Sequence, residues 1–552
     1  MTKQWQPVVA TASTDVLVLG GGIAGHRAAL AAREAGRSVA LATLAQGSSP
    51  FIIGANVPLG IADPADGPEV YFDDMVRGGY ALNDRALVAA MADQAVPAFH
   101  ELDALGVPFA RQDGRVLQRH LSGNTYPRSV YVPEGTGRVV LEYLRAHAQA
   151  SGVELYQGWK VLTLLQDDGM VRGALLAKRH TGELLTIRAR ATVLAMGGIG
   201  RLYDDSTYPA DVAADAYALA YDAGATLIDM EFVQFEPVVT VWPEACRGLE
   251  MPTAMLGDGA RLLNARGERF MFRHNPEHGE KRIEKARMAL CIQQEIDEGR
   301  GFPDGSVLFD TTAVPCERLE SYVSHCRRLR AAGLDPAREG PRVRPAAHSQ
   351  MGGVRIDAQG WSGVPGLYAG GEAAGGVHGA SRLAGNGGSD TIVFGAIAGR
   401  GAAAGLLPDA APDWAAIERA ALAPLRRATG VGGRVAPDKV KLAVRRLMAR
   451  GAGLYREAAG LEAAAAEAEH LQATVDAGLE AEGTTEAVAA LEARNMVLTA
   501  RLILHAAMLR TESRGAHQRR DHPRQDDAAW LRHLACHRGA EGQPAVEALP
   551  IR

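Results

Sequence analysis

A glycine-rich loop near the start of the chain carries the first chemical signal. The loop fits the GxGxxG spacing, follows an apolar strand over residues 15–20 and opens a helix over residues 23–36. In such a loop the glycines permit a tight turn, a close approach to a pyrophosphate and close packing of helix on strand. The positive end of the helix adds to phosphate binding. The residues that we expect at the cofactor are Gly20, Gly22, Ile23, Ala24 and Gly25.

The second strand, over residues 38–42, narrows the choice of dinucleotide. NAD-binding folds usually place an acidic ribose ligand near the end of this strand. Here the strand is followed by Thr43, with no Asp or Glu beside it. We expect the Thr43 hydroxyl to serve the ribose, and the missing carboxylate argues against simple NAD binding.

Two further strand-and-glycine segments point to FAD. Residues 366–378 combine a strand, the acidic Glu372 and several glycines. Residues 191–203 form another apolar strand that ends in Gly197 and Gly198. Glycine signatures at both ends of a long chain are typical of FAD, whose pyrophosphate and ribityl chain need separate segments. The sequence therefore predicts an FAD site built from three distant stretches.

The elements that must position these segments follow from the hydrophobic periodicity. We expect helices at residues 84–106, 137–151, 210–224, 279–298 and 388–405, and strands at 153–165, 171–177, 184–195, 353–357 and 366–370. Residues 414–508 are rich in Ala and Leu and read as a helical bundle. The tail from residue 510 is rich in Arg, His and Asp.

Composition excludes several classes of protein. The 552 residues carry a net charge of −5, which argues against a nucleic-acid binder, although the Arg- and His-rich tail is the one segment that resembles such a surface. The five cysteines are scattered, so we predict no metal site, no iron–sulfur cluster within this chain, and a reducing cytoplasm. We see no signal peptide and no membrane span, so any membrane association needs a partner protein.

Several motifs in order resemble the succinate dehydrogenase/fumarate reductase flavoprotein family, which includes L-aspartate oxidase and the adenylylsulfate reductase flavoprotein. They are DMEFVQF at 229–235, GARLLNARGERFMF at 259–272, HSQMGG at 348–353, the glycine-rich stretch 366–395 and the tail from Arg510 to Trp530. The resemblance covers residues from about 15 to 535. It implies an FAD-dependent oxidoreductase that exchanges hydride between flavin N5 and a carbon next to a carboxylate.

The resemblance also implies the architecture. We expect an α/β protein with a discontinuous, Rossmann-like FAD-binding domain, an α+β capping domain and a C-terminal helical bundle. The boundaries that we assign are residues 1–235 and 351–408 for the FAD-binding domain, 236–350 for the capping domain, 409–508 for the bundle and 509–552 for the tail.

Three residues match family positions at the cofactor and substrate. Arg382, in GASRLAGNG, matches the arginine that clamps a substrate carboxylate, a task that suits a bidentate guanidinium. His348, in HSQMGG, matches the histidine at the same carboxylate. Glu372 matches the acidic ligand of the flavin ribose.

Other positions depart from the family pattern. Glu236 stands where the family has a substrate-binding histidine, and its carboxylate would repel one end of a dicarboxylate. It could instead accept a hydrogen bond from an amine or hydroxyl, or carry a proton. The proton-donor position falls on Lys285, or on Arg282 or Arg287 after a small shift, while the alternative is a solvated face of a charged helix.

The same region holds a further replacement and an insertion. Asp258 stands in place of a family glutamate, and an extra segment, 249–256, precedes it.

Two changes concern the flavin itself. Residues 44–56 contain no histidine, so we expect the FAD to be bound without a covalent bond. Where the family has Asn-Ser-Leu, this chain has Asn386-Gly387-Gly388, and we expect Asn386 and Gly387 to contact the cofactor. Together the departures argue against succinate as the substrate and leave the flavin chemistry intact.

Two alternatives stay open within the family. One is L-aspartate oxidase, although residues 119–128 show no extra carboxylate for the substrate amine. The other is a flavoprotein that passes electrons to an iron–sulfur partner, as in adenylylsulfate reductase. The helical domain and the tail offer surfaces on which such a partner or a second copy could dock.

Overall fold

The centre of the molecule is a seven-stranded sheet assembled from three distant parts of the chain. The structure, a computed structural model, describes residues 9–409, 412–430, 434–539 and 543–551. In spatial order the strands are β8 (Glu154–Gln157), β2 (Val39–Thr43), β1 (Val9–Leu19), β11 (Leu184–Leu194), β10 (Met170–Lys178) and β9 (Trp159–Asp167), with β18 (Leu367–Ala369) paired to β11. β1, β2, β8, β11 and β18 run parallel. Residues 16–19 of β1 and 191–194 of β11 are buried, and these short, mostly apolar runs made both strands predictable.

Two helices of small residues pack closely on this sheet. α1 (Ile23–Glu34) opens after the first glycine loop, and α11 (Asn386–Ala404) opens after the second glycine-rich segment. A Cβ at Gly395 would lie 2.5 Å from the carbonyl oxygen of Ala24, so only glycine permits this approach. The predicted helix at 388–405 is therefore confirmed, and its glycines explain how it lies against α1.

Further elements complete this part of the molecule. They are η1 (Ser49–Phe51), β3 (Ala55–Asn56), α2 (Pro68–Gly78), α3 (Arg85–Ala104), β4 (Arg111–Gln112), β5 (Arg115–Val116), β6 (Gln118–Arg119), β7 (Ser129–Val130), α4 (Thr136–Ala150), η2 (Gly200–Leu202), α5 (Asp215–Asp222) and η4 (Gly371–Ala373). The helix expected at 210–224 begins only at Asp215. Ala214 before it adopts a left-handed conformation with φ +62°, which stops the helix from starting earlier.

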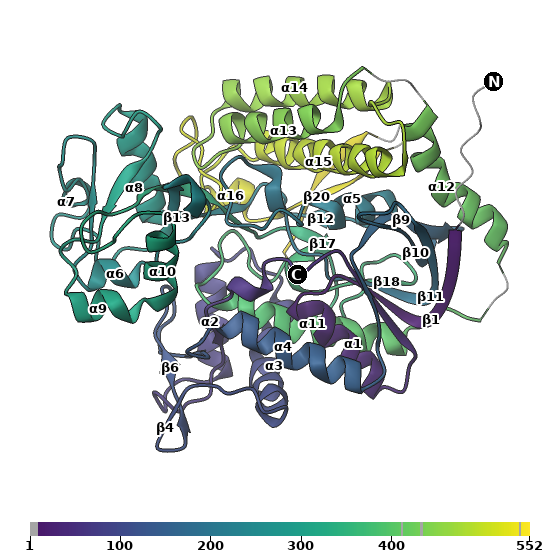
Figure 1. Cartoon of the computed structure of the whole chain (residues 1–552), viewed down its shortest axis with the longest axis horizontal. Helices are drawn as coiled ribbons and strands as arrows, with labels where there is room; N and C mark the ends of the chain where they lie inside the picture. The colour runs from purple at the N-terminus through teal and green to yellow at the C-terminus, as the bar shows by residue number, and fades with distance from the viewer. Residues whose placement is uncertain (1–8, 410–411, 431–433, 540–542, 552) are drawn as a thin grey trace.

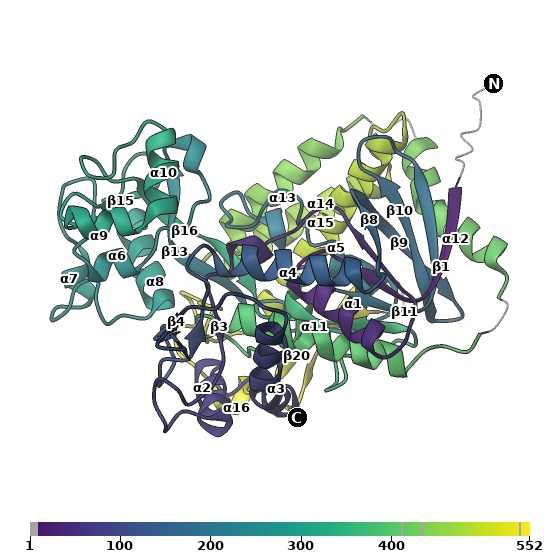
Figure 2. The same cartoon turned by 60° about the horizontal axis from the view of Figure 1, so that its bottom comes forward.

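The elements between β13 and β16 form a separate lobe, here called the cap, which projects on the left of Figures 1 and 2. In chain order they are β13 (Val233–Trp242), η3 (Glu244–Cys246), α6 (Ala254–Gly257), β14 (Arg261–Leu263), α7 (Met271–His274), α8 (Lys285–Asp297), β15 (Val307–Asp310), α9 (Cys316–Ser321), α10 (Val323–Ala331) and β16 (Arg342–Gln350). Its four-stranded sheet has the order β13-β16-β15-β14. The cap has its own apolar core, which includes Met251, Ile292 and Phe309.

The charged helix expected at 279–298 is shorter than predicted. Gly279 and Arg282 adopt left-handed conformations, with φ +58° and +51°. A helix cannot pass through such residues, so α8 begins at Lys285.

The predicted helical region 414–508 is confirmed and consists of four helices. They are α12 (Trp414–Gly430), α13 (Pro437–Gly451), α14 (Ala458–Asp476) and α15 (Thr484–Leu509). α13, α14 and α15 pack side by side along the top of Figure 1, and α12 lies against β9 and β10 of the central sheet. No helix among the described residues is long and apolar enough to cross a membrane.

The tail returns to the body of the molecule and adds two strands that the sequence did not predict. β20 (His533–Arg538) and β21 (Pro544–Leu549) extend a five-stranded sheet with β12 (Leu227–Ile228), β17 (Gly353–Arg355) and β19 (Ala374–Gly375), after the short helix α16 (Asp527–Trp530). The tail is thus structurally part of the body.

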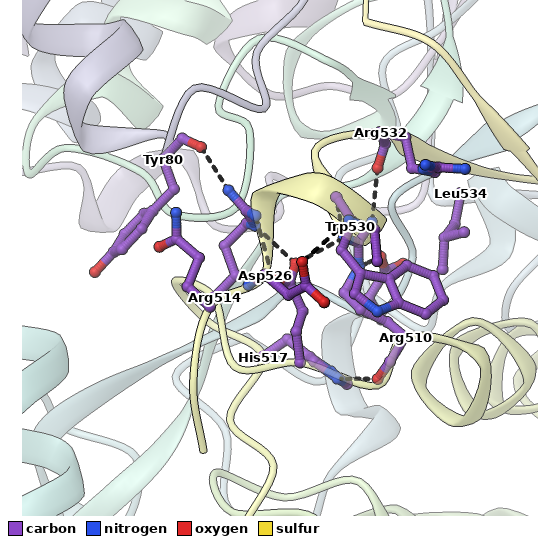
Figure 3. Close-up of polar contacts among 12 residues, drawn as sticks. Tyr80, Arg510, Arg514, His517, Asp526, Trp530, Arg532 and Leu534 are labelled. Atoms are coloured by element: carbon purple, nitrogen blue, oxygen red, sulfur yellow. Dashed lines mark hydrogen bonds and ion pairs between the residues drawn. The ribbon is translucent and has the colours of Figure 1, made fainter. Parts of the chain in front are cut away.

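Buried arginines hold the tail in place. Figure 3 shows Arg510 donating to the carbonyl oxygens of Trp530 and Arg532, each at 2.9 Å, and Arg514 donating to that of Tyr80 at 3.0 Å. The Nε of Arg510 also lies 2.6 Å from Oε1 of Glu231, and both side chains are fully buried. Buried charges need such partners, because an unpaired ion inside a protein is strongly unfavourable.

Replacing Arg510 tests this arrangement. Arg510→Leu leaves Glu231 buried without its ion-pair partner, so we expect the free energy of unfolding to fall by about 3–5 kcal/mol. Urea denaturation followed by far-UV circular dichroism measures the loss. The exposed Arg524, in the same segment, is the matched control, and Arg524→Ala should change stability by less than about 0.5 kcal/mol. Equal stability of the two variants would contradict the role given to Arg510.

Candidate active site

The three glycine-rich segments meet at one edge of the central sheet. A Cβ at Gly20, where φ is +118°, would lie 2.1 Å from the carbonyl oxygen of Ala195. One at Gly198 would lie 2.5 Å from the carboxyl group of Glu372, and one at Gly371 would lie 2.8 Å from Cβ of Ala24. Because each approach excludes a side chain, these glycines let three distant backbones converge.

The N-termini of α1 and α11 are the electropositive ends available to a phosphate-bearing ligand. Their N-cap residues, Gly22 and Gly385, make no side-chain cap hydrogen bond, and neither helix has an acidic residue in its first turn. The Ile23 N–H donates to the Ser49 hydroxyl at 2.9 Å, which fixes the loop that follows β2. Two helix N-termini without acidic residues, beside a glycine cradle, fit the pyrophosphate of a dinucleotide.

The other predicted cofactor residues border this cradle. Thr43 packs against Gly21, where a Cβ would lie 2.5 Å from its hydroxyl oxygen, and its hydroxyl donates to the Ala45 carbonyl. The side-chain oxygen of Asn386 accepts from the Asn56 amide at 2.6 Å. Gly387 lies against the guanidinium of Arg382, with only 3.1 Å between Nη1 and a would-be Cβ.

Glu372 connects the cofactor cradle with the cap hinge. Its Oε1 accepts from the backbone N–H of Gln350 at 2.9 Å and from the hydroxyl groups of Ser349 and Tyr208. Burial raises the pKa of Glu372, although the Tyr208 hydroxyl and the Gln350 N–H oppose that rise. The carboxyl group is therefore placed at the end of β16, the strand that leads back from the cap.

A second cluster forms where the cap meets the body. β13 and β16 pair antiparallel, with Glu236 opposite Ala346, and this register brings Glu236 and His348 to the same region. Lys285, the first residue of α8, reaches the cluster from the cap. Its Nζ lies 2.7 Å from Oε1 of Glu236 and 3.1 Å from Oε1 of Glu250.

The two carboxyl groups beside Lys285 have pKa values that are shifted in opposite directions. Burial and the neighbouring Glu250 raise the pKa of Glu236 to about 8, against the opposing effect of Lys285. Burial alone would raise the pKa of Glu250 too, but Lys285 and His348 lower it to about 2. Burial would lower the pKa of Lys285, but the two carboxylates raise it well above its ordinary value. The lysine is therefore held in its charged form.

His348 and Arg382 face this cluster. The Nδ1 of His348 lies 3.0 Å from the Thr207 hydroxyl. Burial, together with the charges of Arg382 and Lys285, lowers the pKa of His348 to about 4, so the imidazole is neutral at physiological pH. Among the described residues, the buried Nε of Arg382 has no hydrogen-bond partner. An unpaired guanidinium donor beside a neutral histidine suits an anionic ligand.

The structure separates some of the predicted residues from this site. The guanidinium group of Arg287 lies near Cys291 and Tyr455 and is not among the neighbours of Glu236. Arg282 is exposed. Asp258 accepts a 2.7 Å hydrogen bond from the Tyr322 hydroxyl elsewhere in the cap. Of the candidate proton donors, Lys285 alone among these residues lies within hydrogen-bond distance of Glu236.

Sequence reasoning did not identify Glu250. It lies in the extra segment at 249–256, and a single acidic residue there carries no pattern that distinguishes it from a surface glutamate. Glu236, Glu250 and His348 offer ligand atoms within 4.8 Å of one another, a spacing that suits a metal ion. Lys285 already supplies the cation between the two carboxylates, so this cluster does not call for a metal.

Comparison with known protein families identifies the cofactor of the first cluster. Residues 15–387 match the family model described as an FAD binding domain, and residues 441–552 match the model of the fumarate reductase flavoprotein C-terminus. The N-termini of α1 and α11 and the glycine cradle fit the pyrophosphate of FAD. FAD is therefore the cofactor of the first cluster.

Individual relatives cover nearly the whole chain. One component of the CoM/CoB fumarate reductase of Methanothermobacter marburgensis is 34% identical over 96% of this chain and 98% of its own length. The L-aspartate oxidase of Streptomyces coelicolor is 33% identical over 95% of this chain and 91% of its own. The structure of a variant quinol fumarate reductase flavoprotein from E. coli superimposes with a TM-score of 0.91 at 28% identity, covering 98% of this chain and 97% of that one.

The segment at residues 44–56 generates a prediction about how FAD is held. It contains no histidine, and its Ser49 hydroxyl is engaged by the Ile23 N–H. We therefore expect acid precipitation of the purified protein to release all of its FAD into the supernatant, measured by absorbance near 450 nm. Yellow colour that stays with the precipitate would contradict non-covalent binding.

Proposed function

Because the chain belongs to the fumarate reductase and succinate dehydrogenase flavoprotein family, we propose that it reduces a small organic acid that presents a single carboxylate to the site. The observation that carries this proposal is the position of Lys285 between Glu236 and Glu250. The family assignment establishes an FAD-dependent oxidoreductase. The charges around Lys285 influence which organic acid the site accepts.

The net charge of the site is balanced by one singly charged anion. Lys285 and Arg382 contribute two positive charges, while His348 is neutral. Glu250 contributes a negative charge, and Glu236 contributes another once the pH exceeds its raised pKa of about 8. The sum is one positive charge below that pH and zero above it. A monocarboxylate balances this site, whereas a dicarboxylate adds a second negative charge next to Glu236.

Each residue then has a defined task. The carboxylate is held by the free donor of Arg382 and by His348. FAD, when bound, supplies the hydride chemistry of the family. Lys285 would deliver the proton to the carbon next to the carboxylate, and the hydride would enter the other carbon of the conjugated double bond. Contact with Glu236 and Glu250 keeps the ammonium group of Lys285 charged. Because Lys285 stays protonated at working pH, its amine is not available to accept a proton, so the site favours reduction of a double bond over dehydrogenation.

The alternatives fit the geometry less well. L-aspartate oxidase would need a carboxylate free to accept the substrate amine, but Glu236 and Glu250 are both engaged by Lys285. Fumarate would bring two negative charges to a site that carries one positive charge below about pH 8. An iron–sulfur partner protein, docking on the helical domain or the tail, stays a prediction, as does a cytoplasmic location.

A substrate panel tests the proposal. The FAD-loaded protein, reduced by light under anaerobic conditions, is mixed with crotonate, fumarate or L-aspartate, and the return of the 450 nm absorbance is followed. Reduced flavin should be reoxidised by crotonate at least tenfold faster than by fumarate, because only the monocarboxylate balances the site. Faster reoxidation by fumarate would contradict the proposal, and reduction of the oxidised protein by L-aspartate would favour the oxidase.

Variants assign the proton donor within the same assay. Lys285→Met should slow crotonate reduction by about 10²–10⁴-fold, the range of general acid catalysis, without loss of FAD. Lys281→Met removes an exposed lysine four residues earlier and should leave the rate unchanged. If both variants keep the full rate, Lys285 is not the donor.

The raised pKa of Glu236 makes a separate prediction about pH. Below about pH 8 Glu236 carries a proton and the site attracts an anion; above it the new negative charge weakens binding. We expect crotonate affinity, measured by perturbation of the flavin spectrum, to fall several-fold as the pH rises through that value. Glu236→Gln stays neutral at every pH and should abolish this fall, whereas the exposed Glu277→Gln should keep it. A pH dependence that survives in Glu236→Gln would assign it to another group.

A further inference from the structure

α8 connects the active site with the far side of the cap. Its first residue is Lys285 and its last is Asp297, so the two ends lie about 18 Å apart at 1.5 Å per residue. The helix packs on β13 and β16. Met288, Cys291 and Ile292 belong to the cap's own apolar core, whereas Ala289 and Leu290 pack on the core of the body. Because a helix moves as a rigid element, a shift of its Asp297 end also moves Lys285.

A residue of the tail holds the Asp297 end. The Arg520 guanidinium forms an ion pair with the Asp297 carboxylate. It also lies over the ring of Tyr455, 4.6 Å from the centroid, in the turn between α13 and α14. The backbone N–H of Arg520 donates to the Arg456 carbonyl at 2.8 Å. Arg520 is thus anchored to the helical domain while its charge reaches the cap.

The surroundings of this contact are open. A cavity of about 400 Å³ separates the cap from the helical domain, with Gln293 and Ile296 of α8 on one side and Leu454 and Tyr455 on the other. Asp297 and Arg520 themselves line it. In this gap the two lobes are not joined by a continuous apolar interface, so an ion pair across it can bias the position of the cap. Figures 1 and 2 show the cap as a lobe joined to the body near β13 and β16.

We propose that Arg520 is a positioning residue, which latches Asp297 to the helical domain and thereby holds the cap with Lys285 over the site. The value of this latch for the reaction rests on the proposed role of Lys285, but the latch itself concerns only the position of the cap. Both side chains are partly exposed, 48% for Arg520 and 34% for Asp297. Exposed ion pairs are weak, so the latch shifts the cap between positions by about two- to fivefold in population and still permits opening.

The position of the cap can be measured without any substrate. Cys316 is the exposed thiol of the cap, and Cys246, Cys291, Cys326 and Cys536 are buried. Spin labels on Cys316 and on Glu462→Cys, an exposed position of α14, report the distance between cap and helical domain by pulsed electron resonance in the FAD-loaded protein. In this background we compare Arg520→Ala, Asp297→Asn and the charge exchange Arg520→Asp with Asp297→Arg.

The outcomes separate a latch from a merely structural role. We expect both single variants to raise the population of longer distances two- to fivefold, the exchange to restore the original distribution, and the exposed Arg524→Ala to leave it unchanged. An unaltered distribution in Arg520→Ala, or an exchange that fails to restore a changed one, would overturn the proposal. Because neither substrate nor Lys285 enters this measurement, a failure of the proposed function leaves its result intact.

Discussion

The antiparallel pairing of β13 with β16 is the constraint on which the rest of the site depends. This ladder is the covalent entrance to and exit from the cap, and its register sets Glu236 opposite Ala346 and brings His348 to the same place. The strand then continues to Gln350, whose N–H binds the carboxyl group of Glu372 at the cofactor cradle. One ladder therefore ties the cap, the substrate residues and the cofactor residues to a common frame. A shift of one residue would turn Glu236 and His348 away from the site.

Charge balance explains why the departures from the family pattern belong together. A buried glutamate at position 236 would be costly without a cation, and Lys285 provides one at 2.7 Å. Glu250 adds a second contact that keeps the lysine charged. The three residues thus form one unit, in which replacing Lys285 or Glu250 alone leaves an uncompensated charge. That coupling links the proposed substrate to the proposed proton donor, since the lysine that contacts both glutamates is also the residue to which the proton transfer is assigned.

Local sequence predicted the elements whose signals are local. The first glycine loop, the apolar strands β1 and β11 and the helices of residues 414–508 all carry strong periodicity, and the structure confirms them. The expected starts at residues 210 and 279 were wrong, because left-handed residues such as Ala214 and Arg282 interrupt the helical pattern without altering composition. β20 and β21 were missed because a strand such as HLACHR has no alternation of its own and forms only by pairing with β12.

The sequence by itself determined the cofactor class, because glycine turns and their flanking strands carry that information in short stretches. Through its resemblance it also singled out Arg382 and His348. Only the tertiary structure shows that Lys285 contacts Glu236. Lys285 and Arg287 stand about 200° apart around a helix with 100° per residue, so only one of them can face Glu236. The tertiary structure alone brought in Glu250 and the contact of Arg520 with Asp297. Such contacts join residues that are tens or hundreds of positions apart, and no local pattern records which side chains the fold will bring together.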